Sequence, residues 1–437
     1  MADELRSRIA HLSRRAGFGA TPAALDAAVG IGFEATVASL FDVGAPDAGT
    51  AATPPPTAFT LIAPLPRTSG EEKKARNQRK SAQNQQLARW WLDRMTATDR
   101  PLVEKMTLFW HGHFATGIEK VDEAVFMLAQ NQIFRSSGLG GFTLLALAVG
   151  NDPAMLVWLD ANDNRKGSPN ENFSRELMEL FTIGIGSYGD TDVREAARAF
   201  TGTRVDRNSG TVSVLPRQVD GAPKTILGET RTFGFDDTVS FLADRPETAA
   251  FVSSKLWSRF AYPVVVNDPV VADLAAVFRT QGTIAGVMRA LFLHPQFTST
   301  TARQGLVKQP IEWVVGSIRA VGMRANEFDV VGPNLLTTLR DLSQVPFNPP
   351  SVGGWPQNGY WLSTATALAR LRFANGLAGR ANLAWLSGAG TTARPDMIAR
   401  QLGIDGWTRA TRDGIVKASN PRTQLVVALT SPEYVLA

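Results

Sequence analysis

Residues 168–184 read SPNENFSRELMELFTIG, and this stretch decides the fold class. Ser168 is followed three residues later by Glu171, which is the pattern of a helix capping box, and Pro169 suits the first helical position. Apolar residues then follow at helical spacing as far as Gly184, namely Phe173, Leu177, Leu180 and Phe181. The sequence therefore predicts an amphipathic helix that begins at Ser168 and stops at Gly184.

The same helical pattern recurs along most of the chain. Thr21-Pro22 and Pro101 are typical helix starts, and a long helix is expected from about residue 71 to 95. Helical periodicity returns over residues 251–260, 270–278 and 284–292. The strongest strand signal lies at about 211–234, where apolar and polar residues alternate around Asp220-Gly221.

These patterns predict a mainly α protein, with a large multi-helix globular body and one small β-hairpin insertion at about 211–234. Long Pro/Gly-rich loops are expected to interrupt it, at about 43–70 and 343–363. We predict a single domain over residues 1–437, with the β insertion spanning about 205–240.

Composition excludes several classes of site. The 437 residues contain no Cys, which excludes disulfides, thiolate metal sites and a cysteine nucleophile. The net charge of +5 is spread along the chain, so no specific nucleic-acid partner is expected. No run approaches the roughly 18 apolar residues of a membrane span. The start, MADELRSRIAHLSRRAGFGA, carries no signal-peptide pattern, so a cytoplasmic protein is expected, with export and processing as the alternative.

Two of the four His lie in the WHGHF segment, residues 110–114, at the end of the helix that Pro101 starts. Residues two apart on a helix point about 200° away from each other, which separates His111 from His113 unless Gly112 unwinds the last turn. The pair is therefore structural, or serves acid–base chemistry or substrate binding beside Trp110. Metal ligation by His111, His113 and Glu176 is a further alternative.

A polar stripe follows the helix expected after Ser168, formed by Glu171, Asn172, Arg175, Glu176 and Glu179. The stripe is either a solvated helix face or the wall of a polar cleft. In a cleft, Arg175 would hold a neighbouring carboxylate ionised, and burial would raise the pKa of Glu176 for acid catalysis. Asn170 and Asn172 are then candidate substrate-binding residues.

The segment VPFNPPSVGGWPQNGYW, residues 345–361, is a shaped loop rich in Pro and Gly. Its aromatic and amide side chains suit a flat, partly polar ligand, or they cover the core; the candidates are Asn348, Trp355, Tyr360 and Trp361. Near the N-terminus, HLSRRAGFGAT is not a phosphate-binding GxGxxG, so it supports a nucleotide site only weakly.

Six segments in order resemble the bacterial domain of unknown function 1800 family, over residues 11–376. They are HLSRRAGFGATPAAL, FWHGHFATG, GSPNENFSRELMELFTIGIGSYGDTDVREAARAFTG, RPETAAFVSSKLWSRF, FLHPQFTS and VPFNPPSVGGWPQNGYWLSTAT. The resemblance implies no settled activity. It implies that the WHGH segment and the NENFSREL helix meet at one cleft, and that a partner comes from a neighbouring sulfatase-like family. Many members look exported, a feature this sequence does not share.

Together these features favour an enzyme, specifically a hydrolase acting on a carbohydrate or similar polar polymer. Glu176 or Glu171 would be the acid or base, His111 or His113 a second proton-transfer group, and Arg175 an orienting charge. No cofactor is expected in this case. One alternative is a divalent-metal enzyme with two His and one carboxylate. Another is a non-catalytic binding or assembly module of the cell envelope. Substrate and oligomeric state are left open.

Overall fold

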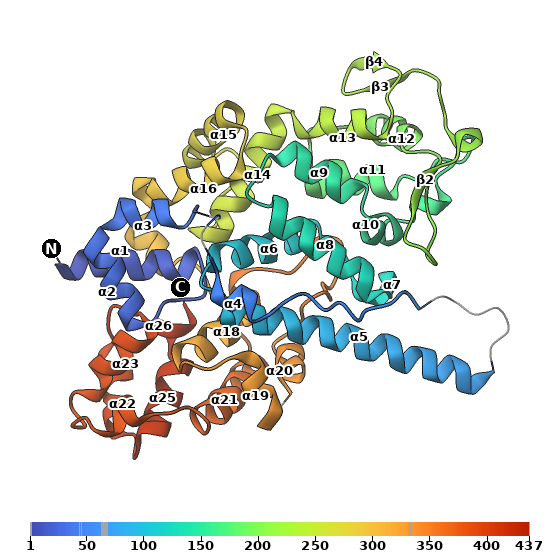
Figure 1. Ribbon diagram of the computed structural model, residues 1–437. Coiled ribbons are helices and arrows are strands. Elements are labelled where there is room, and N and C mark those ends of the chain that lie inside the picture. Colours follow the sequence, from blue (N-terminus) through green and yellow to red (C-terminus); the bar gives the residue numbers. More distant parts are fainter. Residues whose placement is uncertain (1, 43, 45, 63–68, 332–333, 437) are drawn as a thin grey trace.

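The computed structural model describes residues 2–42, 44, 46–62, 69–331 and 334–436, and it is mainly α (Figure 1). The predicted fold class is therefore confirmed. The first ten helices are α1 (Ala2–Arg15), α2 (Pro22–Ile31), α3 (Phe33–Ser39), α4 (Ala48–Ala51), α5 (Gly70–Ala97), α6 (Pro101–His113), α7 (Ile118–Val121), α8 (Ala124–Ser137), α9 (Phe142–Gly150) and α10 (Pro153–Trp158).

The middle of the chain holds the strands and the helices around them. These are η1 (Ala161–Asp163), α11 (Asn172–Glu176), η2 (Leu177–Phe181), α12 (Asp190–Ala199), β1 (Thr203–Val205), β2 (Val212–Val214), η3 (Pro216–Gln218), β3 (Lys224–Ile226), β4 (Glu229–Arg231), α13 (Phe235–Ala243), α14 (Pro246–Phe260), α15 (Pro269–Gln281) and α16 (Ile284–Leu293). The expected helices at 251–260, 270–278 and 284–292 are confirmed as parts of α14, α15 and α16.

The C-terminal part is again helical. It comprises η4 (Pro295–Thr298), α17 (Thr300–Arg303), α18 (Pro310–Ala320), α19 (Ala325–Val331), α20 (Leu335–Asp341), η5 (Asn358–Trp361), α21 (Thr364–Ala378), α22 (Ala384–Ser387), α23 (Arg394–Leu402), α24 (Arg409–Lys417), α25 (Pro421–Thr430) and α26 (Pro432–Val435). Within the described residues, no helix is both long and apolar enough to cross a membrane.

Helix starts follow the expected capping chemistry at two of the predicted positions. The Thr21 hydroxyl accepts a hydrogen bond from the Ala24 N–H, and Pro22 takes the first helical position of α2. Pro101 likewise opens α6. The loop expected at 43–70 contains the short helix α4, and residues 43, 45 and 63–68 of that loop lie outside the described residues.

The capping box predicted at Ser168 is wrong, because the helix begins four residues later, at Asn172. Ser168 instead exchanges two backbone hydrogen bonds with Arg165, across a tight turn in which Gly167 has a φ of +83°. After Glu176 the helix changes from α to π geometry over Leu177–Phe181. The altered turn breaks the regular spacing of about 100° per residue on which the predicted polar stripe depended.

The small β insertion is confirmed, but it contains two separate antiparallel pairs and not the single hairpin predicted around Asp220-Gly221. Strand β1 pairs with β2, and β3 pairs with β4. The second pair closes through Leu227 and Gly228, which both have positive φ, as a type I′ hairpin turn requires. Pro216 starts the short helix η3 between the two pairs and ends the run of extended residues.

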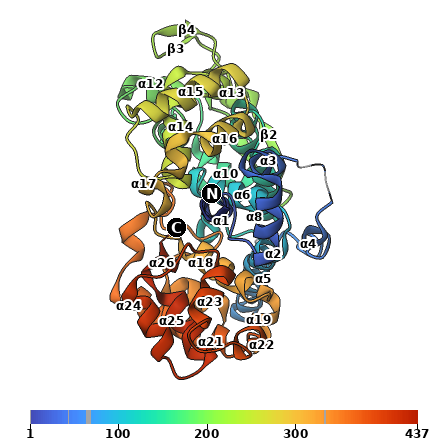
Figure 2. The ribbon, with the colours of Figure 1, turned by 90° about the vertical axis from the view of Figure 1, so that its left-hand side faces the viewer.

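Buried hydrophobic side chains gather in two clusters. One joins α1 and α6 to helices between α9 and α16, and the other joins α5 and α18 to helices α20–α25. Figure 2 shows α13–α16 toward one end of the molecule, α21–α25 toward the other, and α1, α6 and α18 between them. This middle region carries the candidate site. The assignment of the whole chain to one domain stays a prediction.

Candidate functional site

A buried ion network lies in the middle region, centred on Glu312 in the first turn of α18. The Glu312 carboxylate lies 2.6 Å from the Arg259 guanidinium of α14 and contacts the Lys105 ammonium of α6. It also accepts the Gln309 backbone N–H at 3.0 Å, as in a capping box. Burial alone would raise the pKa of Glu312, but Arg259 and Lys105 outweigh it and lower the pKa to about 2.

Positive charge exceeds negative charge in this network. Five buried cations belong to this network through charge interactions with Glu312 or Lys308, namely Arg14, Arg15, Lys105, Arg259 and Lys308. Burial lowers the pKa of Arg15 to about 9 and that of Lys105 to about 8, since a charged group is disfavoured away from water. Glu312 already binds two cations, so it cannot neutralise the others.

Lys308 is the least compensated of these cations. Its side chain lies directly before α18, is only 8% exposed, and has its Nζ 3.5 Å from the centre of the Tyr434 ring. Within the described part of the chain, the Lys308 ammonium has no hydrogen bond or ion pair. Burial, and then the nearby Arg14, lower the pKa of Lys308 well below its usual range, and Glu312 only partly opposes them.

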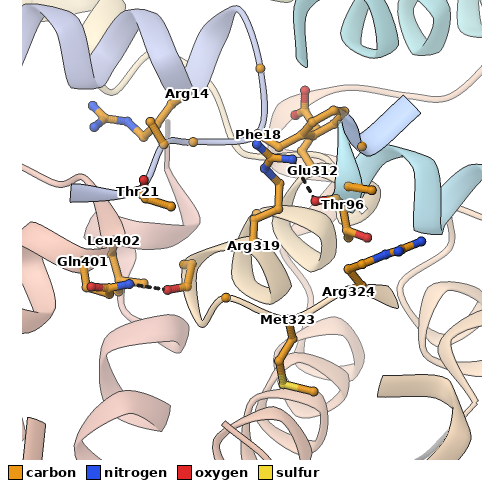
Figure 3. Close-up of a pocket in the computed structure, with 18 of the residues that line it drawn as sticks. Arg14, Phe18, Thr21, Thr96, Glu312, Arg319, Met323, Arg324, Gln401 and Leu402 are labelled. Atoms are coloured by element: carbon orange, nitrogen blue, oxygen red, sulfur yellow. Dashed lines mark hydrogen bonds between the residues drawn. The ribbon is translucent and has the colours of Figure 1, made fainter. Parts of the chain in front are cut away.

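Lys308 and Glu312 line a cavity of about 320 Å³, which we call the Lys308 cavity. Figure 3 shows Arg14, Thr21, Arg319 and Leu402 around it. Its walls come from the last turn of α1 and the segment 17–21 that follows it, the ends of α4 and α5, α18 with the loop 322–324 after it, and α23. Segments from the beginning, middle and end of the sequence therefore build one cavity.

The other cations of the cavity wall have partners. Nη1 of Arg319 donates to the backbone oxygens of Thr96 at 2.8 Å and Thr98 at 2.9 Å, as Figure 3 shows for Thr96. The Arg324 guanidinium pairs with the Asp93 carboxylate, and Arg14 donates to the Gly403 carbonyl oxygen. Among the described cations of the cavity wall, Lys308 is therefore the one whose charged group has no hydrogen bond or ion pair.

Glycine at one wall position permits close packing. A Cβ on Gly316 of α18 would lie 2.9 Å from the Phe18 carbonyl oxygen, closer than side-chain carbons normally approach. The RRAGFG segment can therefore lie directly against α18. In this way a segment that matched no phosphate-binding pattern forms part of the wall of the Lys308 cavity.

Both His of the WHGH segment are buried and uncharged. His111 Nε2 accepts the Phe347 backbone N–H at 3.0 Å, which fixes the loop 345–361 against α6. His113 Nε2 lies 3.0 Å from the Phe181 carbonyl oxygen at the end of η2. Burial is the main cause that lowers the pKa of each ring to about 3.

The WHGH segment and the chain from Asn172 to Phe181 do meet. The His side chains and the Glu carboxylates predicted to act together do not line a common cavity. The Glu171 carboxylate pairs with Arg175 at 2.9 Å, and Arg175 also reaches Asp190 at 3.3 Å. Burial and then the neighbouring Glu179 raise the pKa of Glu176, as expected from the sequence. Neither Glu171 nor Glu176 lines a cavity with His113.

The structure does not bring together the side chains that were considered as ligands of a divalent metal. Among the residues whose placement is described, no group of three or more His, Asp or Glu side chains is arranged to hold a metal ion. The set His111, His113 and Glu176 is therefore not assembled as a metal site: His111 accepts the Phe347 backbone N–H, and His113 contacts the Phe181 carbonyl oxygen.

The predicted ligand-binding residues are dispersed. Trp110 is fully buried, and its indole N–H donates to the Gly138 carbonyl oxygen at 2.7 Å. Asn170 accepts the Asn172 backbone N–H at 2.9 Å, and Asn172 Nδ2 donates to Asp160 at 3.0 Å. These groups are occupied by contacts within the chain.

The aromatic residues of the loop 345–361 separate as well. Tyr360 is 67% exposed, and Trp361 beneath it is fully buried. The Asn348 amide donates to Glu119 at 3.2 Å. Trp355 is buried against His111, with ring centres 5.2 Å apart. The loop therefore does not form a continuous aromatic surface.

One smaller cavity does bring two predicted residues together. His113 and Trp355 line a space of about 100 Å³, which we call the His113 cavity, with Lys255, Arg259, Gln309 and Gln357. Sequence reasoning missed Lys255, Lys308 and Glu312. Gln309-Pro310 followed by Glu312 is itself a helix-start pattern, which is the one signal that marked this position.

Comparison with known proteins gives a single match. A family model matches residues 11–436, nearly the whole chain, and confirms the resemblance carried by the six quoted segments. No curated protein matches. No solved structure matches either.

Proposed function

Since the chain belongs to the family described as "Protein of unknown function (DUF1800)", which brings no activity with it, we propose its function from its own geometry. The protein binds, in the Lys308 cavity, a small molecule that carries an oxyanion such as a phosphate, sulfate or carboxylate. The observation that carries this proposal is the buried Lys308 ammonium, which has no hydrogen bond or ion pair with any described residue.

An unpaired buried ammonium is costly in a folded protein. The effective penalty for burying an ion is several kcal/mol unless a counter-charge and hydrogen bonds compensate it. Glu312 is engaged by Lys105 and Arg259, and among the described residues no other carboxylate forms an ion pair with Lys308. An oxyanion in the cavity would provide both the charge and the acceptors that Lys308 lacks, in the positive field of Arg14.

The other residues of the cavity wall restrict the size and the polarity of the rest of the ligand. Phe18, Met323 and Leu402 contribute apolar surface, and several glycines leave the backbone close to the cavity. About 320 Å³ lies near the lower end of the range for small-molecule sites. These features favour a compact ligand, with its oxyanion at Lys308 and an apolar part toward Leu402 and Met323.

The test is calorimetric titration of the wild-type protein with sodium phosphate, sodium sulfate and sodium acetate. Lys308→Met removes the ammonium, and Lys417→Met removes the same charge from an exposed position on α24. A hydrogen bond to a charged group contributes about 1.5–3 kcal/mol, so Lys308→Met should weaken binding about 10- to 100-fold. Lys417→Met should bind as the wild type does.

The two variants also separate loss of binding from loss of folding. Without anions, Lys308→Met should unfold at a temperature equal to or above that of the wild type, because it removes an uncompensated buried charge. The proposal fails if none of the three anions binds the wild type, or if Lys308→Met binds them as tightly.

The hydrolase hypothesis stays a prediction. In its favour, the raised pKa of Glu176 is the direction that an acid catalyst requires. Against it, the Glu171 and Glu176 carboxylates line neither cavity, so no pair of catalytic groups faces a common space there. Oxyanion binding at Lys308 does not require Glu171 or Glu176. It is compatible both with an enzyme and with a non-catalytic binding module.

A further inference from the structure

We propose that the His113 cavity is a second binding site, separate from the Lys308 cavity, and that it takes a neutral hydroxyl-bearing ligand such as a polyol or a single sugar unit. The two cavities share no lining residue. The Glu312–Arg259 ion pair lies between them, with Glu312 in the wall of the first and Arg259 in the wall of the second.

The first observation is an unsatisfied acceptor on His113. A carbonyl oxygen only accepts, so the 3.0 Å contact with Phe181 places a proton on Nε2 of His113. In the neutral ring, Nδ1 then carries a lone pair and no proton. This Nδ1 is fully buried and has no hydrogen-bond partner among the residues that the structure describes. The ring therefore presents one acceptor that the chain leaves unused, which is uncommon for a buried polar atom.

The second observation is a pair of unsatisfied donors in the same wall. Trp355 Nε1 is buried and has no hydrogen-bond partner in the described part of the chain. Lys255 is half-buried on α14, and its Nζ lies 5.1 Å from the centre of the Phe251 ring. The Lys255 ammonium has no hydrogen bond or ion pair within the described ranges. The side chains that line the cavity thus carry both donors and an acceptor that the described residues leave unused.

These groups select a hydroxyl over an oxyanion. A hydroxyl accepts from Lys255 or Trp355 while it donates its own proton to His113 Nδ1. A carboxylate or phosphate oxygen would satisfy the donors but would face the His113 lone pair with negative charge. The Arg259 guanidinium, which would otherwise favour an anion, is already bound to Glu312. A neutral ligand with more than one hydroxyl satisfies both kinds of group.

The cavity is reachable from solvent. Gly353 and Gln357 in its wall are exposed, whereas His113 and Trp355 lie at its buried side. Its walls come from α6, α14 and the loop 345–361. A space of about 100 Å³ holds more than a single water molecule, which suits the end of a sugar or a small polyol.

The experiment is a titration of ¹⁵N-tryptophan-labelled protein with glycerol, D-glucose and glycolate, following the indole N–H signals by NMR. Trp355→Phe identifies the Trp355 signal, which should shift on addition of glycerol or glucose. Lys255→Met should weaken glucose binding about tenfold in the same assay, the effect of losing one charge-assisted hydrogen bond. Both changes spare the packing around His113, whose own replacement risks unfolding.

Trp361→Phe is the matched control. The Trp361 indole N–H is also buried without a partner, but it lines neither cavity, so this variant should bind glucose as the wild type does. Phosphate affinity at Lys308 should be unchanged in Lys255→Met, which makes the two sites distinguishable. The inference is overturned if glycerol and glucose leave the Trp355 signal in place, if glycolate alone shifts it, or if Lys255→Met binds glucose with wild-type affinity.

Discussion

The Glu312 carboxylate lies 2.6 Å from the Arg259 guanidinium, and the same carboxylate contacts the Lys105 ammonium. These three side chains come from α18, α14 and α6, so one acidic residue joins the two hydrophobic clusters of the protein. Because the surrounding charges are mostly positive, Glu312 holds together groups that would repel one another without it.

Glu312→Gln should therefore be strongly destabilising. The amide keeps the shape but leaves Lys105 and Arg259 buried without their counter-charge, which typically costs about 3–5 kcal/mol of unfolding free energy. Urea denaturation measures the loss. Glu171→Gln is the control, since the exposed Glu171–Arg175 pair should contribute less than about 1 kcal/mol. Equal losses in the two variants would contradict the role given to Glu312.

Helix positions could be predicted from the sequence where local chemistry decides them. Thr21-Pro22 and Pro101 start helices as expected, because capping and proline geometry act within one turn. Ser168 shows the limit of this reasoning. Its side-chain pattern matched a capping box, yet the turn at Gly167 and the hydrogen bond from the Asn170 backbone to Asn164 hold that segment outside the helix.

The candidate site was harder to predict, because burial of a charge is a tertiary property. Lys308 and Glu312 occur at spacings common on solvated helices, and only the packing of α1, α6 and α14 around them makes them unusual. His113 and Trp355 line one cavity, whereas Glu171 and Glu176 line neither the Lys308 cavity nor the His113 cavity, and residue spacing within one helix does not show which segments meet in the folded chain.

His111 should prove structural. His111→Leu removes the acceptor of the buried Phe347 N–H, and an unsatisfied buried donor costs about 1–3 kcal/mol. His294 also accepts a backbone N–H, from Gln296 at 3.1 Å, but its side chain is partly exposed and water can replace it. His294→Leu should therefore cost less in urea denaturation. A larger loss in His294→Leu than in His111→Leu would refute this assignment.

Asp152 should make the protein less stable as pH rises. Burial raises the pKa of Asp152 to about 7, against about 3.9 in an unfolded chain. Between these values the folded state binds more protons than the unfolded state, so the unfolding free energy falls from about pH 4 to about pH 7 and is level above. Asp152→Asn does not titrate, and its amide oxygen can still accept the Met155 backbone N–H, so it should remove this fall in urea titrations at several pH values.

Asp47 should have the opposite effect on how the unfolding free energy changes with pH. Burial would raise its pKa, but hydrogen bonds from Thr98, Asp99 and Thr50 lower it to about 2. Its contribution to stability is therefore present above about pH 4 and is lost as pH falls toward 2. Asp47→Asn should change the acid end of the stability profile and leave the range from pH 5 to 8 with the wild-type slope. If Asp47→Asn instead changed the slope of the unfolding free energy between pH 5 and 8, the roles given to Asp47 and to Asp152 would both be contradicted.

Lys308 should be the most reactive lysine toward a small aldehyde that carries a carboxylate. Its lowered pKa leaves more free amine near pH 7 than an exposed lysine has, with an ordinary pKa of about 10.4. With glyoxylate, the amine adds to the aldehyde carbon and water leaves to give an imine. Cyanoborohydride then supplies the hydride that reduces the imine to a stable carboxymethyl amine, which peptide mass mapping locates.

Lys105 is the internal control for this labelling. Burial lowers its pKa to about 8, but its ammonium donates to the Gly17 carbonyl oxygen at 2.9 Å, contacts Glu312 and lines neither cavity. We therefore expect Lys308 to be labelled first, Lys105 to stay unlabelled, and sodium phosphate to slow the reaction at Lys308 because it occupies the same cavity. Labelling of exposed lysines at the same rate as Lys308, or no protection by phosphate, would show that the amine is not presented to a ligand.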